Sequence, residues 1–184
     1  MTASRIVPQK ELGEIIDGSM GIRWFSDRFP SQPIATIALD FNHHSQWYDA
    51  YGGEHRDEAM YTFFSKLVVL RTRSTYNLEI TGRYGPDKFM LVYAEDVTGL
   101  DTIANELKTS IDETTIPNPK NLLSHSNWKE SGIDLDPTKL TVRVGIAYQQ
   151  TSPRSISGLV DRAIIATHEA KTMPGQIVIV EYTP

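Results

Sequence analysis

Two aspartates lie at positions where a protein could hold a divalent metal ion. Asp40 closes the apolar segment 34–40, and Asp87 lies in the short connection between two further apolar segments. Carboxylate oxygens are the ligands that Mg²⁺ prefers, and bound Mg²⁺ commonly bridges substrate phosphates. If the fold brings the two aspartates together, they could support in-line attack on a phosphorus atom. The structural alternative is that Asp40 caps the following helix and Asp87 only forms a turn, since aspartate is common at both positions.

The segments around these aspartates predict one α/β (α+β) domain, with a mixed, mostly antiparallel sheet flanked by helices. Short apolar runs bounded by glycine and proline indicate strands, and apolar residues at helical spacing indicate helices. The strands are predicted at residues 34–40, 77–83, 89–94, 140–146 and 177–180, and the helices at residues 55–73, 100–111 and 156–170, with a short helix that carries Trp47, Tyr48 and Tyr51 before residue 55. The run at 34–40 is typical of a strand buried on both faces, and the run at 140–146 of a half-buried strand. A buried, unpaired carboxylate is costly, so Asp40 must lie at the sheet rim or be paired.

Composition limits the classes of function. The chain has 184 residues, no cysteine and a formal net charge of −5. Its acidic balance argues against nucleic acid and anionic membranes as partners, and the lack of cysteine excludes disulfides and thiolate metal sites. No apolar run is long enough to span a bilayer, so membrane insertion is not expected and a cytoplasmic location is the default expectation. Residues 1–33 are predicted to be a lead-in helix and linker, and residues 34–184 the domain itself.

Five segments carry recognisable patterns: Asp17–Ile22, Leu39–Asp57, Arg83–Phe89, Val142–Ala147 and Arg162–Lys171. In that order they resemble the motifs D-x-L-T-G-L, L-D-x-D-x-F-K-x-x-N-D-x-Y-G, R-Y-G-G-D/E-E-F, V-S-I-G-V-A and R-A-D-x-A-L-Y-x-A-K of GGDEF domains, the diguanylate cyclase family. The resemblance starts near residue 17 and covers nearly the whole chain. It implies the palm-like sheet that this family shares with class III cyclases and many polymerases.

Several site residues of that family have counterparts here. By resemblance, Asp40 and Asp87 would hold two Mg²⁺ ions, Asp57 would help to read guanine, Lys171 would contact phosphate, and Gly85 would bring bare backbone close to the nucleotide. An active member presents one GTP in each of two subunits, and the 3′-hydroxyl of one attacks the α-phosphorus of the other, so a dimer is expected only if the chain is active. The structural alternatives are a rim turn, a helix-start acid and an exposed lysine near a helix C-terminus.

Two departures fall in the hairpin, whose signature is degenerate and reads Gly85-Pro-Asp-Lys-Phe89. Pro86 fixes φ and lacks the backbone N–H that a Gly-Gly turn would offer to phosphate. Lys88 replaces the usual glutamate and puts a cation beside the two acids. At about 4 Å and an effective dielectric near 20, each unit charge interacts at roughly 4 kcal/mol, so divalent binding should be weakened. Lys88 could instead pair with Asp40 or Asp87 and occupy the place of the metal.

Four further positions depart from the motifs. Asn42 replaces the second acid of the first motif, Ser45 replaces its phosphate-binding lysine, and Tyr48 stands where the guanine-reading asparagine would be. Tyr48 could stack on a base or be a plain helix-surface tyrosine. The arginine that follows the phosphate-binding lysine has no clear match beyond Gln176.

These residues leave three functions open. The first is a degenerate GGDEF-like domain of cyclic-di-GMP signalling that binds GTP or a cyclic dinucleotide at most and acts as a regulatory or interaction module with a protein partner. The second is an active Mg²⁺-dependent nucleotide cyclase with an altered site. The third is a purely structural partner-binding domain.

Overall fold

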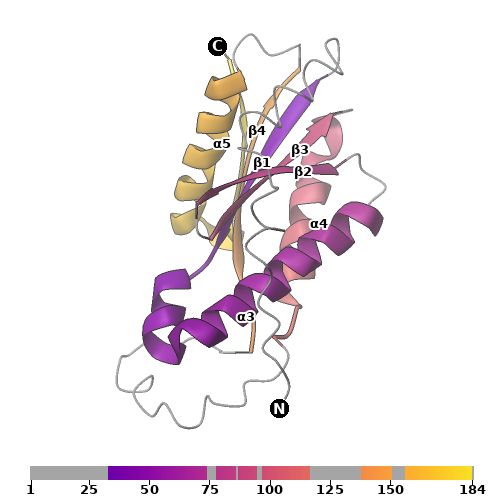
Figure 1. Ribbon diagram of the computed structural model, residues 1–184. Coiled ribbons are helices and arrows are strands. Elements are labelled where there is room, and N and C mark those ends of the chain that lie inside the picture. Colours follow the sequence, from indigo (N-terminus) through magenta and orange to yellow (C-terminus); the bar gives the residue numbers. More distant parts are fainter. Residues whose placement is uncertain are drawn as a thin grey trace.

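Five strands and three main helices make up the part of the chain that the computed structural model describes, which is residues 33–73, 78–85, 87–94, 97–116, 138–150 and 156–183. Figure 1 shows their arrangement. The strands are β1 (Ile34–Phe41), β2 (Leu78–Gly85), β3 (Lys88–Ala94), β4 (Val142–Gln149) and β5 (Ile177–Glu181); the helices are α3 (His44–Arg73), α4 (Leu100–Asp112) and α5 (Ile156–Glu169); and the 3₁₀ turns are η1 (Val97–Gly99), η4 (Ala170–Thr172) and η5 (Pro174–Gln176). The predicted lead-in, apart from residue 33, lies outside the described residues.

The strands form one mixed sheet in the order β2-β3-β1-β4-β5. All neighbouring pairs are antiparallel except β4 and β5, which are parallel. The predicted fold class is therefore confirmed, and the first strand lies beside the hairpin. The register places Asp40 of β1 opposite Lys88 of β3 and opposite Arg143 of β4.

Helices cover both faces of the sheet, with α5 on one side and α3 and α4 on the other (Figure 1). Because successive side chains of a strand point to opposite faces, β1 contributes to both cores. Its odd-numbered apolar residues, such as Leu39, pack with Phe63 and Ile103. Its even-numbered residues, such as Ala38, pack with Leu159. Asp40 shares this second face.

The prediction of a half-buried strand near residues 140–146 was wrong. In β4 only Arg143 and Tyr148 are partly exposed, and the other residues are buried. The strand lies between β1 and β5 and has helices over both faces, so it has no solvent-facing side to accommodate polar alternation.

A close contact between a helix and the sheet lies at Gly145 of β4. A Cβ atom added there would lie 2.2 Å from the backbone nitrogen of Thr167 on α5. Thr167 Oγ1 donates to the carbonyl oxygen of Ala163 at 2.9 Å, and it also lies 3.4 Å from the carbonyl oxygen of Ala38. Only glycine leaves room for the helix backbone at this point, and the contact sets how α5 crosses the sheet.

Helix α3 begins at His44, well before the predicted start at residue 55, and it is kinked. Gly52 has φ 80° and ψ 172°, a conformation outside the helical region that glycine tolerates. The sequence predicts a separate short helix that carries Trp47, Tyr48 and Tyr51, and in the structure this helix and the one predicted from residue 55 are joined across the kink at Gly52. Within the described ranges, no helix is both long and apolar enough to cross a membrane.

Candidate functional site

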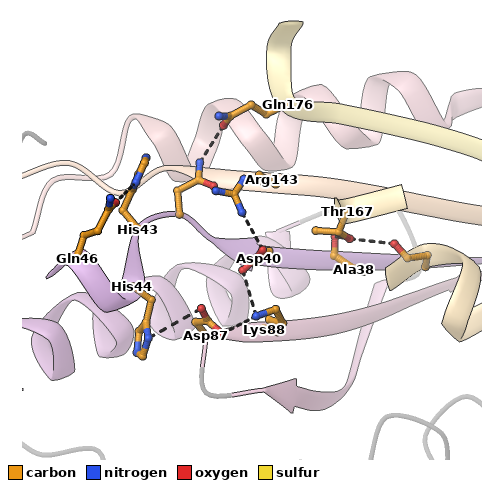
Figure 2. Close-up of polar contacts among 12 residues, drawn as sticks. Ala38, Asp40, His43, His44, Gln46, Asp87, Lys88, Arg143, Thr167 and Gln176 are labelled. Atoms are coloured by element: carbon orange, nitrogen blue, oxygen red, sulfur yellow. Dashed lines mark hydrogen bonds and ion pairs between the residues drawn. The ribbon is translucent and has the colours of Figure 1, made fainter. Parts of the chain in front are cut away.

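A chain of charged side chains crosses three neighbouring strands near the end of β1 (Figure 2). Arg143 Nη1 donates to Asp40 Oδ2 at 3.0 Å. Lys88 Nζ lies 3.7 Å from Asp40 Oδ1 and donates to Asp87 Oδ1 at 3.0 Å. At the start of α3, His44 Nδ1 lies 3.9 Å from Asp87 Oδ2. Both predicted acids thus lie in one cluster, each in contact with the same ammonium group.

The backbone fixes this cluster. Opposite positions in neighbouring strands have side chains on the same face, so Asp40 is placed between Lys88 and Arg143 by the sheet register alone. The N–H of Phe41 also donates to the carbonyl oxygen of Asp87 at 2.9 Å. This bond attaches the turn of the hairpin to the end of β1 and holds Asp87 near Asp40.

Burial makes the pairing necessary. The side chains of Asp40, Asp87 and Arg143 are 8, 14 and 14% exposed, and that of Lys88 is 27% exposed. Charges in such positions require partners because removing them from water is costly. Asp40 is therefore paired rather than open at the sheet rim. The expected pairing of Lys88 is present with both acids.

Arg143 was missed by the sequence reasoning. The family motif that resembles this strand has serine at the corresponding place. An arginine inside an otherwise apolar strand was therefore the feature of the sequence that could have indicated a buried ion pair. Its partner Asp40 lies 103 residues away in the chain. Only the register of β1 against β4 shows that the two side chains meet.

As arranged here, Asp40 and Asp87 do not fit a divalent metal ion. Lys88 Nζ contacts one oxygen of each, and Arg143 engages the second oxygen of Asp40. In the described part of the chain, no three or more histidine, aspartate or glutamate side chains are grouped so that they could hold a metal ion. A metal at this place would have to displace Lys88 from between the acids.

Tyr84 packs beside this cluster at the end of β2. Its hydroxyl oxygen is buried. Burial, followed by the negative charge of Asp40 and then that of Asp87, raises the pKa of the Tyr84 phenol well above its usual range, and a contact with Thr167 opposes the rise. The phenol therefore stays neutral and adds no charge to the cluster.

Two of the predicted nucleotide-binding residues, Tyr48 and Asp57, lie on either side of the kink in α3 and each contact Arg56. Tyr48 is 51% exposed, and the guanidinium carbon of Arg56 lies 5.0 Å from the centre of its ring. Arg56 also donates to Asp57 Oδ1, from Nε at 2.9 Å and from Nη2 at 2.6 Å. The carboxylate of Asp57 is thus already partnered. Arg56, which the sequence reasoning did not single out, joins the two predicted residues.

The other predicted positions are distributed around the cluster. Gly85 is half-buried, and a Cβ there would come within 3.2 Å of the Lys88 side chain, so its small size lets Lys88 fold against the hairpin. Ser45 is exposed in the first turn of α3, and Lys171 is exposed in η4. Pro86 lies outside the described residues.

Asn42 is buried just beyond the cluster. Its Nδ2 donates to Gln176 Oε1 at 2.8 Å and thereby joins the end of β1 to η5. The two positions at which the sequence departs from an acid and an arginine of the family motifs are therefore in direct contact.

Comparison with known proteins gives a result at the level of structure. No family model matches the sequence, and no curated protein does. The GGDEF domain of DgcB from Caulobacter crescentus, in complex with c-di-GMP, superposes with a TM-score of 0.64 at 16% identity, over 86% of this chain and 81% of that one. The active GGEEF domain of a diguanylate cyclase from Vibrio cholerae gives 0.63 at 14% identity, over 95% and 97%.

A third similar structure contains a protein partner. The diguanylate cyclase SiaD from Pseudomonas aeruginosa, in complex with its activator SiaC, gives a TM-score of 0.63 at 16% identity, over 94% of this chain and 57% of that chain. These likenesses span most of the present sequence and agree with the strand order and the flanking helices. The chain has the fold of a GGDEF domain.

Proposed function

We propose that this chain is a degenerate GGDEF-like domain of cyclic-di-GMP signalling, with little or no cyclase activity, that serves as a nucleotide-binding or regulatory module. The observation that carries the proposal is the position of Lys88 and Arg143. The two acids that would hold Mg²⁺ by the resemblance are instead paired with these side chains. In this arrangement the cations of the site come from the protein itself.

Charge explains why the substitution opposes catalysis. Two carboxylates, one ammonium and one guanidinium sum to zero, so the cluster lacks the negative excess that attracts a divalent ion. A divalent ion within about 4 Å of Lys88 would be repelled by roughly 8 kcal/mol at an effective dielectric of about 20, before screening. Asn42 and Ser45 remove a further acid and a phosphate-binding lysine relative to the motif. Within the described residues, the ion-pair partners of Asp40 and Asp87 are Lys88, Arg143 and His44, none of which adds a negative charge.

Residues outside the ion cluster support nucleotide binding. Lys171 is exposed and free to approach a phosphate, and Tyr48 with Arg56 offers an exposed ring and guanidinium on which a base can stack. Asp57 is exposed, although Arg56 holds one of its oxygens. We propose GTP or a cyclic dinucleotide as the ligand of this surface, with Gly85 lining the hairpin side.

A protein partner is the second part of the proposal. One structurally similar cyclase, 57% of whose chain the likeness covers, was solved in complex with its activator protein, and this supports a protein partner for the present chain. A domain without turnover can still transmit a signal if its partner distinguishes the nucleotide-bound form from the free form. No dimer is required for that role.

The test is a direct comparison of turnover and binding. The chain is incubated with GTP and either Mg²⁺ or Mn²⁺, and cyclic di-GMP is sought by chromatography, with an active GGEEF domain treated in parallel. Binding of GTP and of cyclic di-GMP is measured by calorimetry with and without Mg²⁺. We expect binding without turnover, and an affinity that Mg²⁺ does not raise. Robust formation of cyclic di-GMP would sink the proposal.

An active cyclase with an altered site is the second candidate, because Asp40 and Asp87 remain within 3.7 and 3.0 Å of one atom, Lys88 Nζ. If the amine moved outward, a pair of acids would face one position. Product formation with any nucleoside triphosphate would favour this candidate. Absence of both turnover and nucleotide binding would favour the third, a domain that binds only a protein partner.

A further inference from the structure

Asn42 connects two parts of the site that lie far apart in the sequence. Its side chain donates to Gln176 across a separation of 134 residues, at 2.8 Å. Asn42 is 1% exposed, whereas Gln176 is half-buried in η5. Figure 2 shows the dashed line that reaches Gln176 from the end of β1. A buried amide that forms one long-range hydrogen bond fixes the relative position of the elements it joins.

The backbone on both sides of this hydrogen bond is strained. Within the described residues, His43 (φ 63°) and Gln176 (φ 55°) are the non-glycine residues with positive φ. His43 directly follows Asn42, and Gln176 is the acceptor. A non-glycine residue keeps this conformation only where its surroundings hold it there, and such positions concentrate at functional sites.

The turn that contains Gln176 continues from the segment that carries Lys171. The N–H of Met173 donates to Ala170 at 3.2 Å, and the N–H of Gln176 donates to Met173 at 3.1 Å. Gly175, with φ 77°, makes the turn reverse before β5 begins. Lys171 thus lies on a short connection between the end of α5 and Gln176. The hydrogen bond to Asn42 anchors this connection to the sheet.

We propose that Asn42 is a positioning residue: through Gln176 it holds the turn 174–176 in its left-handed conformation and so fixes where Lys171 presents its ammonium group. The part of this inference that concerns a ligand rests on the proposed nucleotide binding. The part that concerns the turn does not. Where the family motifs have an acid and an arginine, this chain uses two neutral amides, so the anchoring contact needs no ion and should not weaken in salt.

The first experiment measures the turn itself. Hydrogen–deuterium exchange is followed by mass spectrometry on peptides that cover residues 170–177, in wild type, Asn42→Ala and Gln176→Ala. Loss of the side-chain bond should speed exchange there by about fivefold, the effect of one hydrogen bond of ordinary net strength. Gln176→Ala keeps the test decisive if Asn42→Ala fails to fold, since Gln176 is only half-buried.

Thr36→Val is the matched control. Thr36 lies on β1, and its hydroxyl is also buried. It is distant in the strand from the end that carries the hydrogen bond. The control should leave exchange at residues 170–177 unchanged. Equal exchange in Asn42→Ala, Gln176→Ala and wild type would overturn the proposal.

The second experiment is a rescue. Glycine adopts positive φ without strain, so Gln176→Gly in the Asn42→Ala background should restore slow exchange at residues 174–177 although it lacks the hydrogen bond. A packing role of Asn42 predicts no such rescue. Exchange that stays fast in the double variant contradicts a role through the turn conformation.

The third experiment measures affinity for GTP by calorimetry without Mg²⁺. We expect Asn42→Ala to bind about fivefold more weakly, Thr36→Val to bind as wild type does, and the double variant to recover. If exchange changes while all variants bind GTP with equal affinity, the inference that Asn42 positions Lys171 is wrong. If wild type binds neither GTP nor cyclic di-GMP, the proposed nucleotide binding fails, and the exchange data alone decide the role of Asn42 in the turn.

Discussion

Replacing Lys88 by glutamine should destabilise the protein and at the same time create a site for a divalent ion. The change removes the positive charge that lies 3.0 Å from Asp87 Oδ1 and 3.7 Å from Asp40 Oδ1. It leaves Asp40 with Arg143, and it leaves Asp87 with His44, whose Nδ1 lies 3.9 Å from Asp87 Oδ2. The two carboxylates would then repel each other without a cation between them.

The size of the effect follows from the geometry. At an effective dielectric of about 20, each contact of Lys88 is worth roughly 5 kcal/mol in Coulomb energy, most of which desolvation offsets. Removing one partner of a buried pair costs about 3 to 5 kcal/mol, and the lower end applies because Lys88 is 27% exposed and Asp40 keeps a second partner. For a chain of this length, a loss of about 3 kcal/mol lowers Tm by roughly 6 to 12 °C.

The assay is thermal and urea unfolding in a titration with Mn²⁺, combined with electron paramagnetic resonance of the free ion. At a Mn²⁺ concentration about 100 times its Kd, binding returns about 2.7 kcal/mol, which is nearly the whole loss in Lys88→Gln. Wild type should show no comparable stabilisation, because Lys88 already fills the position between the acids.

Lys108→Gln is the control. Lys108 Nζ lies 2.6 Å from Asp112 and 3.1 Å from the carbonyl oxygen of Val142, and the side chain is 16% exposed. Its loss should also destabilise the protein, but the single carboxylate of Asp112 gives Mn²⁺ no pair of acids. The view that Lys88 occupies the position of a metal ion would be refuted if Mn²⁺ stabilised wild type and Lys88→Gln equally. It would also be refuted if Mn²⁺ did not stabilise Lys88→Gln at all.

Three further outcomes follow from the same geometry. Arg143→Ser should lower the free energy of unfolding in urea by about 2 to 3 kcal/mol, because Asp40 loses the partner at 3.0 Å and keeps only Lys88; an unchanged urea midpoint would contradict this. Gly145→Ala should lower stability by at least about 3 kcal/mol, or prevent folding, since the new Cβ would lie 2.2 Å from the backbone nitrogen of Thr167, and circular dichroism melts would detect it. Since burial raises the pKa of Tyr84 above its ordinary value of 10.0, the folded protein keeps the phenol neutral at a pH where the unfolded chain ionises. Stability should therefore fall as pH rises beyond about 10, by up to roughly 1.4 kcal/mol per pH unit from this group, and Tyr84→Phe should lose that component in unfolding curves recorded between about pH 9 and 11.

Local patterns predicted most of the fold, because the apolar residues of each helix or strand indicate which of its faces are buried. The run that became β1 is apolar at every position up to Asp40 apart from one threonine, and helices do cover it on both faces. The hairpin followed from Gly-Pro-Asp between two apolar runs. The two helical segments of α3 also followed from the sequence, with a break at the pair Gly52 and Gly53. The structure differs in joining the two segments as one kinked helix.

The candidate site likewise contains contacts that the sequence predicted and contacts that it did not. The pairing of Lys88 was predictable from charge, since an amine next to an aspartate in a hairpin has few other partners. The contacts of Asp40 with Arg143 and of Asn42 with Gln176 were not, because each joins residues more than a hundred positions apart through register and turn geometry. The role of Arg56 could have been predicted from its neighbour Asp57, because the two residues are adjacent and oppositely charged and lie close to a tyrosine in the sequence.

The bond between the N–H of Phe41 and the carbonyl oxygen of Asp87 has a consequence for how such domains diverge. Main-chain hydrogen bonds hold the hairpin on the neighbouring strand whatever side chains it carries, so residues on it can be exchanged without moving the scaffold. Gain or loss of metal chemistry then becomes a matter of a few codons within an unchanged architecture. An ancestor with a working centre and a descendant that only senses its ligand can therefore share nearly the same backbone.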